Sequence, residues 1–221
     1  MITAENVWAV IPAHNESKRI GPVIEKVRKH IKKVIVVDDG SKDNTEQVAA
    51  KKGALVLRHI INLGKGAAVK TGCDYALKKG AEKIILIDAD GQHDPDEIPK
   101  FLNALNNFDI VFGYRRMKKG MPIVIRWGNR FLNMMVGVLF GIQLRDTQCG
   151  YRAFTADAYK KIRWKATDYS MESEMIANVG KNHLNYREVP IETLYLDRFK
   201  GTTVLDGLKI GLDLIKWRLT R

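Results

Sequence analysis

A short apolar segment that ends in two carboxylates places the strongest constraint on how this chain can fold. Residues 84–87 read Ile-Ile-Leu-Ile, an uninterrupted apolar run of the length expected for a β-strand buried on both faces. Asp88 and Asp90 follow directly, and Gln92 and His93 come just after them. Open α/β sheets bind their ligands where such strands end. The segment therefore predicts an α/β fold with a polar site at the carboxyl end of this strand.

The spacing of these carboxylates predicts a site for a divalent cation. A single carboxylate after a strand is commonly a turn former, but Asp88 and Asp90 are separated by one small residue and are followed by the amide of Gln92. Oxygen ligands of this kind suit Mg²⁺ or Mn²⁺ carrying a substrate diphosphate, and they suit Zn²⁺ poorly. The alternative is a solvated turn that caps the next helix. Asp94 fits that alternative, because Pro95 after it is typical of a first helical position.

Strand-like and helix-like segments alternate along the first half of the chain. The expected strands cover residues 7–11, 34–37, 54–57, 84–87 and 109–112. The expected helices cover residues 22–30, 44–52 and 95–106, and a further helix follows the Gly64-Lys65-Gly66 turn and ends near Lys78. Alternation at this spacing indicates right-handed crossovers between parallel strands. In a chain of 221 residues, of which 45% are hydrophobic, we expect one α/β domain with an ample core.

The net charge of +12 is unevenly distributed along the chain. Between Asp109 and Asp146 there is no acidic residue, but there are several basic ones: Arg115, Arg116, Lys118, Lys119, Arg126, Arg130 and Arg145. A basic run of this kind indicates an anionic partner, which is a phosphate group, a nucleic acid or an acidic lipid. Residues 204–219 carry the apolar stripe of an amphipathic helix, which either packs on the core or lies on a membrane surface.

The cysteines and the N-terminal sequence indicate a cytoplasmic protein. Cys73 and Cys149 are too few for a disulfide framework and are spaced unlike a zinc site, so we expect reduced thiols. The first residues lack the pattern of a signal peptide. No segment reaches the roughly 18 uninterrupted apolar residues of a transmembrane helix, and the nearest, residues 131–144, is shorter and interrupted by polar side chains.

Several motifs resemble those of a known enzyme family. The segments I-P-A-H-N-E (11–16), V-V-D-D-G-S-K-D-N-T (36–45), N-L-G-K-G-A-A (62–68) and D-A-D-G-Q-H (88–93) are similar to the nucleotide-sugar-binding half of glycosyltransferase family 2. The segments G-Y-R-R (113–116), R-W-G-N-R-F-L-N (126–133) and D-T-Q-C-G-Y-R-A-F (146–154) resemble its polyprenyl-phosphate branch, the dolichyl-phosphate mannose and glucose synthases. The resemblance covers nearly the whole chain. It implies a GT-A fold, which is a mostly parallel, Rossmann-like sheet with helices on both sides.

The resemblance also implies roles for residues on the donor side. The positions that would border the base and ribose of a nucleotide sugar are Pro12, Ala13, His14, Glu16 and Asp39. Asp88, Ala89 and Asp90 would meet the diphosphate, and the metal ligands would be Asp88, Asp90 and Gln92. Lys65 stands at a helix start, where backbone N–H groups and the ammonium can both meet an anion. A solvated loop lysine is the alternative for this residue.

On the acceptor side the resemblance implies a cluster of phosphate-binding residues, which are Arg115, Arg126, Asn129, Arg130 and Arg152. Asn129 stands where the branch usually has serine. A phosphate acceptor is already a nucleophile at neutral pH, so such an enzyme needs cations that position it and needs no tuned general base. The expected catalytic residues are Asp90, Arg115, Arg126 and Asp146, the last of which either lines the sugar pocket or forms a turn. Glu172 and Glu174 match an acidic position of the family, although they also suit a helix N-terminus.

We therefore expect an inverting, metal-dependent glycosyltransferase that makes a polyprenyl-phosphate sugar. Gln-Cys-Gly at 148–150 resembles the glucosyltransferases of the branch, which favours UDP-glucose over GDP-mannose. The expected organisation is one GT-A domain over residues 1–221, with a nucleotide-sugar-binding half at 1–113, an acceptor-binding half at 114–203 and an amphipathic helix at 204–221. The protein would lie peripherally at the cytoplasmic face of an anionic membrane, or reach it through an anchoring partner protein, and would not bind nucleic acid.

Two other functions remain open at this point. A family 2 transferase with a saccharide or other hydroxyl acceptor would need a carboxylate base near the sugar carbon, and Asp146 is the best candidate. A non-catalytic basic protein that binds nucleic acid or anionic lipid is the third class. It is disfavoured because converging carboxylates would repel such a ligand. A nucleotidyltransferase is disfavoured as well, because the first strand lacks a glycine-rich phosphate-binding turn.

Overall fold

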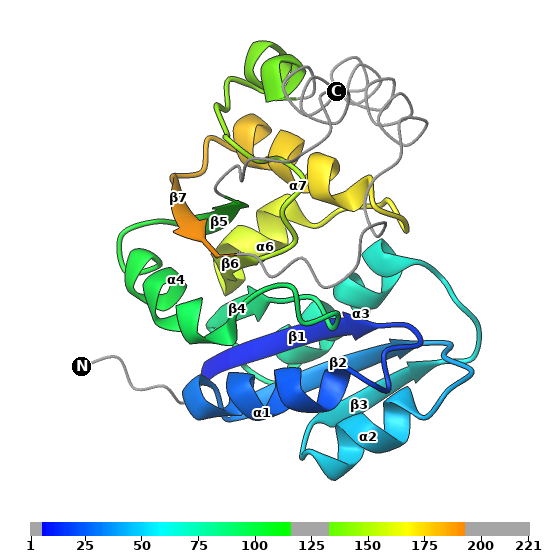
Figure 1. Ribbon diagram of the computed structural model, residues 1–221. Helices are drawn as coiled ribbons and strands as arrows, with labels where there is room; N and C mark the ends of the chain where they lie inside the picture. The colour runs from blue at the N-terminus through cyan, green and yellow to red at the C-terminus, as the bar shows by residue number, and fades with distance from the viewer. Residues whose placement is uncertain (1–5, 116–132, 193–221) are drawn as a thin grey trace.

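The computed structural model describes residues 6–115 and 133–192, which form a seven-stranded sheet covered by helices (Figure 1). The strands are β1 (Val7–Ala13), β2 (Lys33–Asp39), β3 (Leu55–His59), β4 (Lys83–Leu86), β5 (Ile110–Arg115), β6 (Arg152–Thr155) and β7 (Tyr186–Ile191). The helices are α1 (Ile20–His30), α2 (Thr45–Lys51), α3 (Lys65–Lys78), α4 (Ile98–Ala104), α6 (Ala156–Ile162) and α7 (Met171–Lys181), with a 3₁₀ turn, η2, at Pro95–Glu97. Residues 133–140 are also helical.

The sheet has the strand order β3-β2-β1-β4-β6-β5-β7. Strands β1 to β4 are parallel to one another, and β5 is parallel to β7. Only β6 among the described strands runs the other way, and it pairs antiparallel with both β4 and β5. The predicted α/β class and the mostly parallel sheet are confirmed. The expected strands and helices of the first half are all present, with ends that differ by a few residues.

The segment at residues 95–106 was expected to be a single helix, and it differs from that expectation. It is divided into η2 and α4, and α4 begins at Ile98 with Pro99 in its first turn. Proline lacks a backbone N–H and its ring clashes with the preceding turn, so Pro99 is tolerated at a helix start and not in an interior. The expected N-cap at Asp94 is confirmed, because its side chain accepts a hydrogen bond from the Asp96 N–H.

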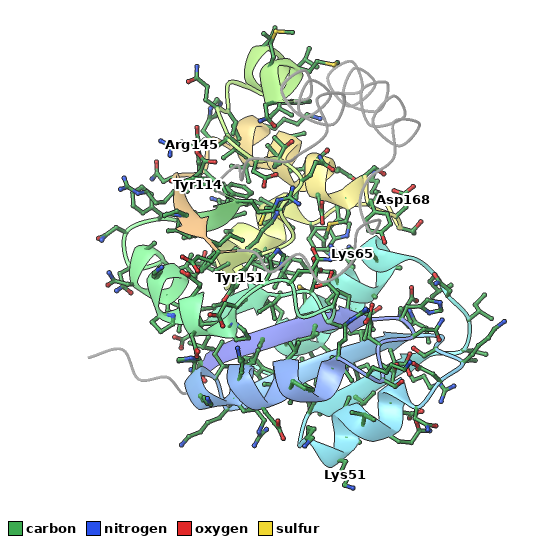
Figure 2. All side chains as sticks on the ribbon, in the orientation of Figure 1. Lys51, Lys65, Tyr114, Arg145, Tyr151 and Asp168 are labelled. Atoms are coloured by element: carbon green, nitrogen blue, oxygen red, sulfur yellow. The ribbon has the colours of Figure 1, made fainter. Side chains whose placement is uncertain are left out.

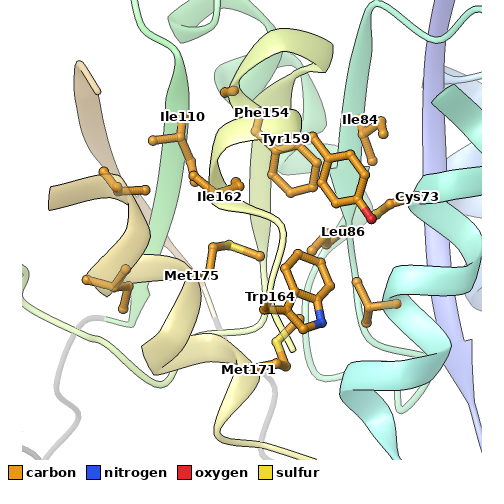
Figure 3. Packing of buried hydrophobic residues seen from close by; sticks show 14 of the residues in the cluster. Cys73, Ile84, Leu86, Ile110, Phe154, Tyr159, Ile162, Trp164, Met171 and Met175 are labelled. Carbon is orange, nitrogen blue, oxygen red and sulfur yellow. The ribbon is translucent and has the colours of Figure 1, made fainter. Parts of the chain in front are cut away.

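The strand that organises the sequence is buried on both faces, as its composition predicts. Ile84 and Leu86 point into a core layer with α3, α6 and α7, where Tyr159 and Trp164 pack (Figure 3). Ile85 and Ile87, which alternate with them, point into the opposite layer. That layer contains the apolar faces of α1 and α4. Since successive side chains of a strand point to opposite faces, a strand between two helical layers has no position for a polar residue.

The same topology brings the polar segments of the sequence to one edge. Parallel strands β1, β2 and β4 end there, and their last residues lead into 12–16, 38–41 and 88–93. Because β6 is antiparallel, it begins at this edge, with Arg152 opposite Leu86 of β4. The D-T-Q-C-G-Y-R segment therefore enters beside the D-A-D segment. We call this side of the sheet the carboxyl edge.

Two further expectations concern boundaries and the end of the chain. The expected boundary between the halves, after residue 113, falls inside β5. The expected amphipathic helix at 204–221 lies outside the described residues. Within the described ranges, none of the helices has the length and apolar character needed to cross a membrane.

Candidate active site

An ion-paired lysine lies at the centre of the carboxyl edge. Lys65 begins α3 (Figure 2). Its Nζ atom lies 2.9 Å from Asp88 Oδ1 and 2.8 Å from Glu172 Oε1. The Lys65 side chain is 18% exposed and that of Glu172 is 6% exposed. Burial alone would lower the pKa of Lys65, but the two carboxylates outweigh it and raise the pKa above its usual value. Lys65 is therefore a charged bridge between the end of β4 and α7, and not a solvated loop lysine.

Two glycines allow the backbone to pass close to this lysine. A Cβ atom at position 66 would lie 2.6 Å from Ala166 O, and one at position 150 would lie 2.5 Å from Asp88 Oδ2. Real Cβ contacts are essentially never shorter than 3.0 Å, so a larger residue at either position would force something to shift. The glycines of the G-K-G and Q-C-G-Y segments thus have the same explanation: each lets one chain segment pack directly against the ion cluster or its supporting loop.

Asp88 and Asp90 differ in their surroundings although they stand on the same turn. Burial alone would raise the pKa of Asp88, but the Lys65 ammonium outweighs it and holds the pKa below its usual value. Burial raises the pKa of Asp90, and the negative charge of Asp88 raises it further. Within the described chain, the Asp90 carboxylate accepts one hydrogen bond, from the Gln92 N–H at 2.9 Å. Asp90 is therefore a partly buried carboxylate that forms no ion pair with the described residues, although the charge of Lys65 opposes part of the rise in its pKa.

This arrangement fits a divalent cation. Mg²⁺ is commonly held by one or two carboxylates together with substrate phosphates and water, so a cage of protein ligands is not required. The described residues contain no group of three or more His, Cys, Asp and Glu side chains around one metal position. His93 lies nearby, with Nδ1 4.0 Å from Asp88 Oδ2, and burial lowers its pKa to about 4. The imidazole is thus neutral at pH 7 and does not supply the missing positive charge.

A small cavity lies against the ion cluster and joins several chain segments. Its lining residues are Pro12, Lys65, Val69, Leu86, Asp88, Gly150, Arg152, Met171 and Glu172. They come from the ends of β1 and β4, from α3, from the segment entering β6 and from α7. Residues expected in the donor half and in the acceptor half therefore line one space.

On the donor side, Asp39 organises the loop between β3 and α3. Its carboxylate accepts hydrogen bonds from His59 Nδ1 at 2.7 Å and from the backbone N–H groups of Leu63 at 2.9 Å and Gly64 at 2.8 Å. A carboxylate has about four acceptor positions, so Asp39 can accept a further bond, such as one from a base N–H. The neighbouring Asp38 is fully buried and accepts the Ser41 N–H at 2.9 Å.

Of the other expected donor-side residues, His14 contacts Asp39 directly. His14 is exposed, and its Nδ1 atom donates to the Asp39 carbonyl oxygen at 2.8 Å. Glu16 is 8% exposed, and its backbone N–H donates to Thr45 Oγ1 at 2.9 Å. The small residues of this set, Ala13 and Ala89, are buried, and Pro12 lines the cavity.

On the acceptor side, Arg115 and Asp146 bind each other. Arg115 Nε donates to Asp146 Oδ2 at 2.6 Å and Nη2 donates to Asp146 Oδ1 at 3.0 Å, a bidentate geometry. Burial alone would raise the pKa of Asp146, but these hydrogen bonds outweigh it and hold the pKa below its usual value. Asp146 is therefore a weak base. The other expected acceptor residues of the basic run, Arg126, Asn129 and Arg130, lie outside the described residues.

Arg152, the remaining residue expected on the acceptor side, is buried and held by the backbone. It is 1% exposed, and its guanidinium donates to three backbone carbonyls, of Thr147, Cys149 and Glu172, at 2.8 to 2.9 Å. The guanidinium also lies over the Phe112 ring. A buried arginine whose donors are bound by carbonyls fixes the turn before β6 against α7. Arg152 also lines the cavity, so its expected contact with the acceptor phosphate stays a prediction beside this structural task.

Several functional contacts could not be found from the sequence. His59, which orients Asp39 through Nδ1 and meets Thr71 Oγ1 at 3.0 Å through its other ring nitrogen, is an example. The feature that could have indicated this contact is the position of His59 at the end of β3, where it pairs in register with Asp39 at the end of β2. Glu174 binds the backbone N–H groups of Lys165 and Ala166, so it supports the loop beside Lys65.

Comparisons with known proteins show the family of this chain. Residues 8–163 match the family model described as glycosyl transferase family 2. The chain is 33% identical to the UDP-N-acetylglucosamine–dolichyl-phosphate N-acetylglucosaminyltransferase of Methanococcus voltae, over 96% of each chain. It is 30% identical to the dolichyl-phosphate β-glucosyltransferase ALG5C of Trichomonas vaginalis, over 94% of this chain and 69% of that one.

Among solved structures, the fold is similar to glucosyl-3-phosphoglycerate synthase of Mycobacterium tuberculosis in complex with Mn²⁺, uridine diphosphate and phosphoglyceric acid. The TM-score is 0.74 at 20% identity, over 97% of this chain and 78% of that one. This likeness concerns the fold, and it confirms the expected GT-A architecture. The family match covers more than half of the chain, so a non-catalytic basic protein is not supported. The chain belongs to glycosyltransferase family 2, and its resemblance to the polyprenyl-phosphate branch of that family is confirmed.

Proposed function

We propose that this protein transfers a hexose from a nucleotide sugar to a polyprenyl phosphate, with a divalent cation held by Asp88 and Asp90. Both relatives described above carry dolichyl phosphate in their names as the acceptor. The sugars in those names differ, namely N-acetylglucosamine and glucose. The Gln-Cys-Gly segment at 148–150 favours UDP-glucose as the donor, with GDP-mannose and UDP-N-acetylglucosamine as the alternatives.

The observation that carries the choice of acceptor is the ion pair between Arg115 and Asp146. A hydroxyl acceptor must lose a proton, and the pairing with Arg115 makes Asp146 a weak base. Glu172, which also lines the cavity, is bound by Lys65. A phosphate monoester carries roughly −1.5 to −2 charges at pH 7 and needs no base. The pairing of Asp146 and of Glu172 therefore suits a phosphate acceptor better than a hydroxyl.

The chemistry proposed is a single displacement at the sugar. An oxygen of the acceptor phosphate forms a bond to the anomeric carbon while the bond from that carbon to the nucleoside diphosphate breaks, so the configuration inverts. When bound, the cation would stabilise the negative charge of the leaving diphosphate. Asp90 is half-buried beside Asp88 on the same turn, which supports its role as a ligand, with Gln92 as a further oxygen donor. Asp146 orients Arg115, which would position the acceptor phosphate together with Arg126 and Arg130.

A panel of substrates tests this proposal. UDP-glucose, UDP-N-acetylglucosamine and GDP-mannose are each incubated with a polyprenyl phosphate, with the matching polyprenol and with simple saccharides, in Mn²⁺ and in EDTA. We expect one donor to give a polyprenyl-phosphate sugar that is sensitive to mild acid, only with the metal. Transfer to the polyprenol or to a saccharide at an equal rate would overturn the choice of acceptor, and full transfer in EDTA would overturn the metal.

A second assay separates the two sides of the site. Arg115→Ala is expected to reduce transfer while leaving the binding of the nucleoside diphosphate nearly unchanged, because a lost charge-assisted contact to phosphate costs about 1.5–3 kcal/mol. Calorimetry with UDP and Mn²⁺ measures the donor side. Loss of UDP binding in this variant would assign Arg115 to the donor. An enzyme with a lipid acceptor works at a membrane, and the basic run between Asp109 and Asp146 would be attracted to an anionic surface. We therefore place the protein peripherally at the cytoplasmic face of a membrane.

A further inference from the structure

The loop between β3 and α3 presents three large apolar side chains to solvent. Ile60 is 98% exposed, Ile61 is 65% exposed and Leu63 is 47% exposed. Single exposed apolar residues are common on protein surfaces, but three within four consecutive residues form a cluster that indicates a contact surface. We call residues 60–63 the apolar tip.

The apolar tip is held in place by the donor side of the site. The Leu63 N–H donates to Asp39 Oδ1 at 2.9 Å, and the side chain of Asn62 accepts the Gly64 N–H at 2.9 Å. Gly40 lies against the tip so closely that a Cβ atom there would be 2.5 Å from the Ile61 carbonyl carbon. The D-D-G-S segment therefore packs against the backbone of the tip and binds it by hydrogen bonds. The exposed isoleucines lie on a loop that is fixed at the carboxyl edge.

The small area of the apolar tip and the charge of the loops beside it indicate which kind of partner the tip contacts. A stable contact between two protein copies buries about 800 Å² on each side, far more than three side chains at a loop tip provide. A few apolar side chains that project from a surface are instead suited to the boundary between lipid headgroups and acyl chains. The adjoining loops at the same edge present two exposed cations, Lys18 and Lys42, against one exposed carboxylate, Asp43. An excess of cations near an anionic surface strengthens such contacts.

We propose that the apolar tip inserts into the surface of a lipid bilayer and holds the carboxyl edge against it. The inference rests on the proposed lipid-phosphate acceptor, because an enzyme with such an acceptor works at a membrane. It adds a contact on the donor half of the chain, separate from the basic run and from residues 204–221. The insertion is apolar, so its contribution resists salt, in contrast to that of the net charge of +12.

A fluorescent probe at the tip tests the insertion directly. The chain has two cysteines, Cys73 and Cys149, and both are buried, so a cysteine introduced at the surface is labelled selectively. Ile60→Cys carries an environment-sensitive dye in the full chain, and vesicles of phosphatidylcholine are used with and without phosphatidylglycerol. Leu55→Cys is the control, because this residue is 38% exposed at the start of β3, the strand whose other end leads into the tip. We expect a blue shift and quenching by lipid-borne quenchers for the label at 60, and neither for the label at 55.

Binding and activity of polar variants complete the test. Ile60→Ser/Ile61→Ser is expected to lower partition onto neutral vesicles about tenfold or more, whereas Leu55→Ser leaves it unchanged. Transfer to a short, water-soluble polyprenyl phosphate should be the same in both variants and in the original protein. If the original protein transfers to no lipid phosphate at all, the proposed function fails, while the vesicle measurements still decide on the tip.

Three outcomes would overturn the proposal. One is a label at position 60 that stays unshifted on protein that sediments with vesicles. Another is partition of the serine variant equal to that of the original protein. The third is a blue shift that develops with protein concentration in the absence of vesicles, accompanied by a dimer in sedimentation velocity, because the tip would then contact a second copy of this chain.

Discussion

Gly150 shows how a single hydrogen atom in place of a side chain supports the site. The Cβ atom of an alanine there would lie 2.5 Å from Asp88 Oδ2 and 2.9 Å from Lys65 Nζ. Gly150→Ala is therefore expected to displace the Asp88 carboxylate, to destabilise the fold by about 1–3 kcal/mol and to reduce transfer by about 100-fold. Urea unfolding and initial rates measure the two effects. Gly137→Ala is the control, because its Cβ atom would meet only Ile142 O at 3.6 Å. Equal activity of both variants would contradict the assignment.

Replacing Asp90 by asparagine is expected to raise the stability of the metal-free fold and to lower the transfer activity. Burial and the charge of Asp88 raise the Asp90 pKa, so at neutral pH the ionised carboxylate destabilises the metal-free fold. Asp90→Asn removes that charge. We expect a higher Tm than that of the original protein in EDTA, a smaller rise of Tm on adding Mn²⁺ with UDP, and transfer reduced by more than about 100-fold. Asp96→Asn, at an exposed position on the same segment, is the control. A variant that keeps its full response to Mn²⁺ would remove Asp90 from the metal site.

At the scale of elements, the turn before α2 makes the free energy of unfolding depend on pH. Asp43 accepts hydrogen bonds from the Thr45 N–H at 3.0 Å and the Ser17 N–H at 3.1 Å. The slight burial of Asp43 opposes ionisation, but the hydrogen bonds from Thr45 and Ser17 outweigh it and lower its pKa from 3.8 to about 2. Since the folded pKa lies below the unfolded one, this stabilisation is complete above pH 3.8 and is lost as the pH falls towards about 2.

Urea unfolding of the original protein and of Asp43→Asn measures this dependence. The difference in unfolding free energy between the two is expected to be largest at neutral pH and to shrink as the pH falls through the window set by the two pKa values. Asp157→Asn serves as the control, because Asp157 is an exposed helix-start residue whose carboxylate contacts Lys160. A difference that is the same at neutral pH and near pH 2 would show that Asp43 acts through its shape and not through its charge.

The elements also show which parts of the fold the sequence predicts and which it does not. Strands β1 to β4 and helices α1 to α3 are local patterns of apolar spacing, and each was expected near its observed place. Strand β6 has four residues and begins with the buried Arg152, so neither its length nor its first residue indicated a strand. Its place depends on pairing with β4, which is more than sixty residues away in the sequence. The Asp88–Lys65–Glu172 cluster depends on the same long-range arrangement, which explains why the sequence indicated each member without indicating the contact.

At the scale of the whole molecule, the two expected halves interlock within one sheet. Strand β4 and the larger part of β5 belong to the expected first half, yet these strands are not hydrogen-bonded neighbours, because β6 lies between them. Strand β5 pairs with β6 on one side and β7 on the other, and both come from the second half. The ion bridge from Lys65 to Glu172 adds a side-chain connection across the same boundary. Donor and acceptor residues are therefore placed relative to each other by the sheet itself.

Interlocking of this kind predicts that the two halves unfold together. If the second half is released, β4 loses its pairing with β6 and β5 loses every strand that it contacts in the described fold, so buried backbone groups would be left without partners. In native-state hydrogen exchange of the full chain, the slowest amides of β4 and β5 are expected to share one opening free energy, equal to that of global unfolding. Amides of β3, which is at the edge of the sheet, should exchange faster and serve as the internal control. Persistent protection of β4 at a urea concentration where β5 already exchanges freely would show that the first half is stable alone, and the site would then be an interface between two independent units.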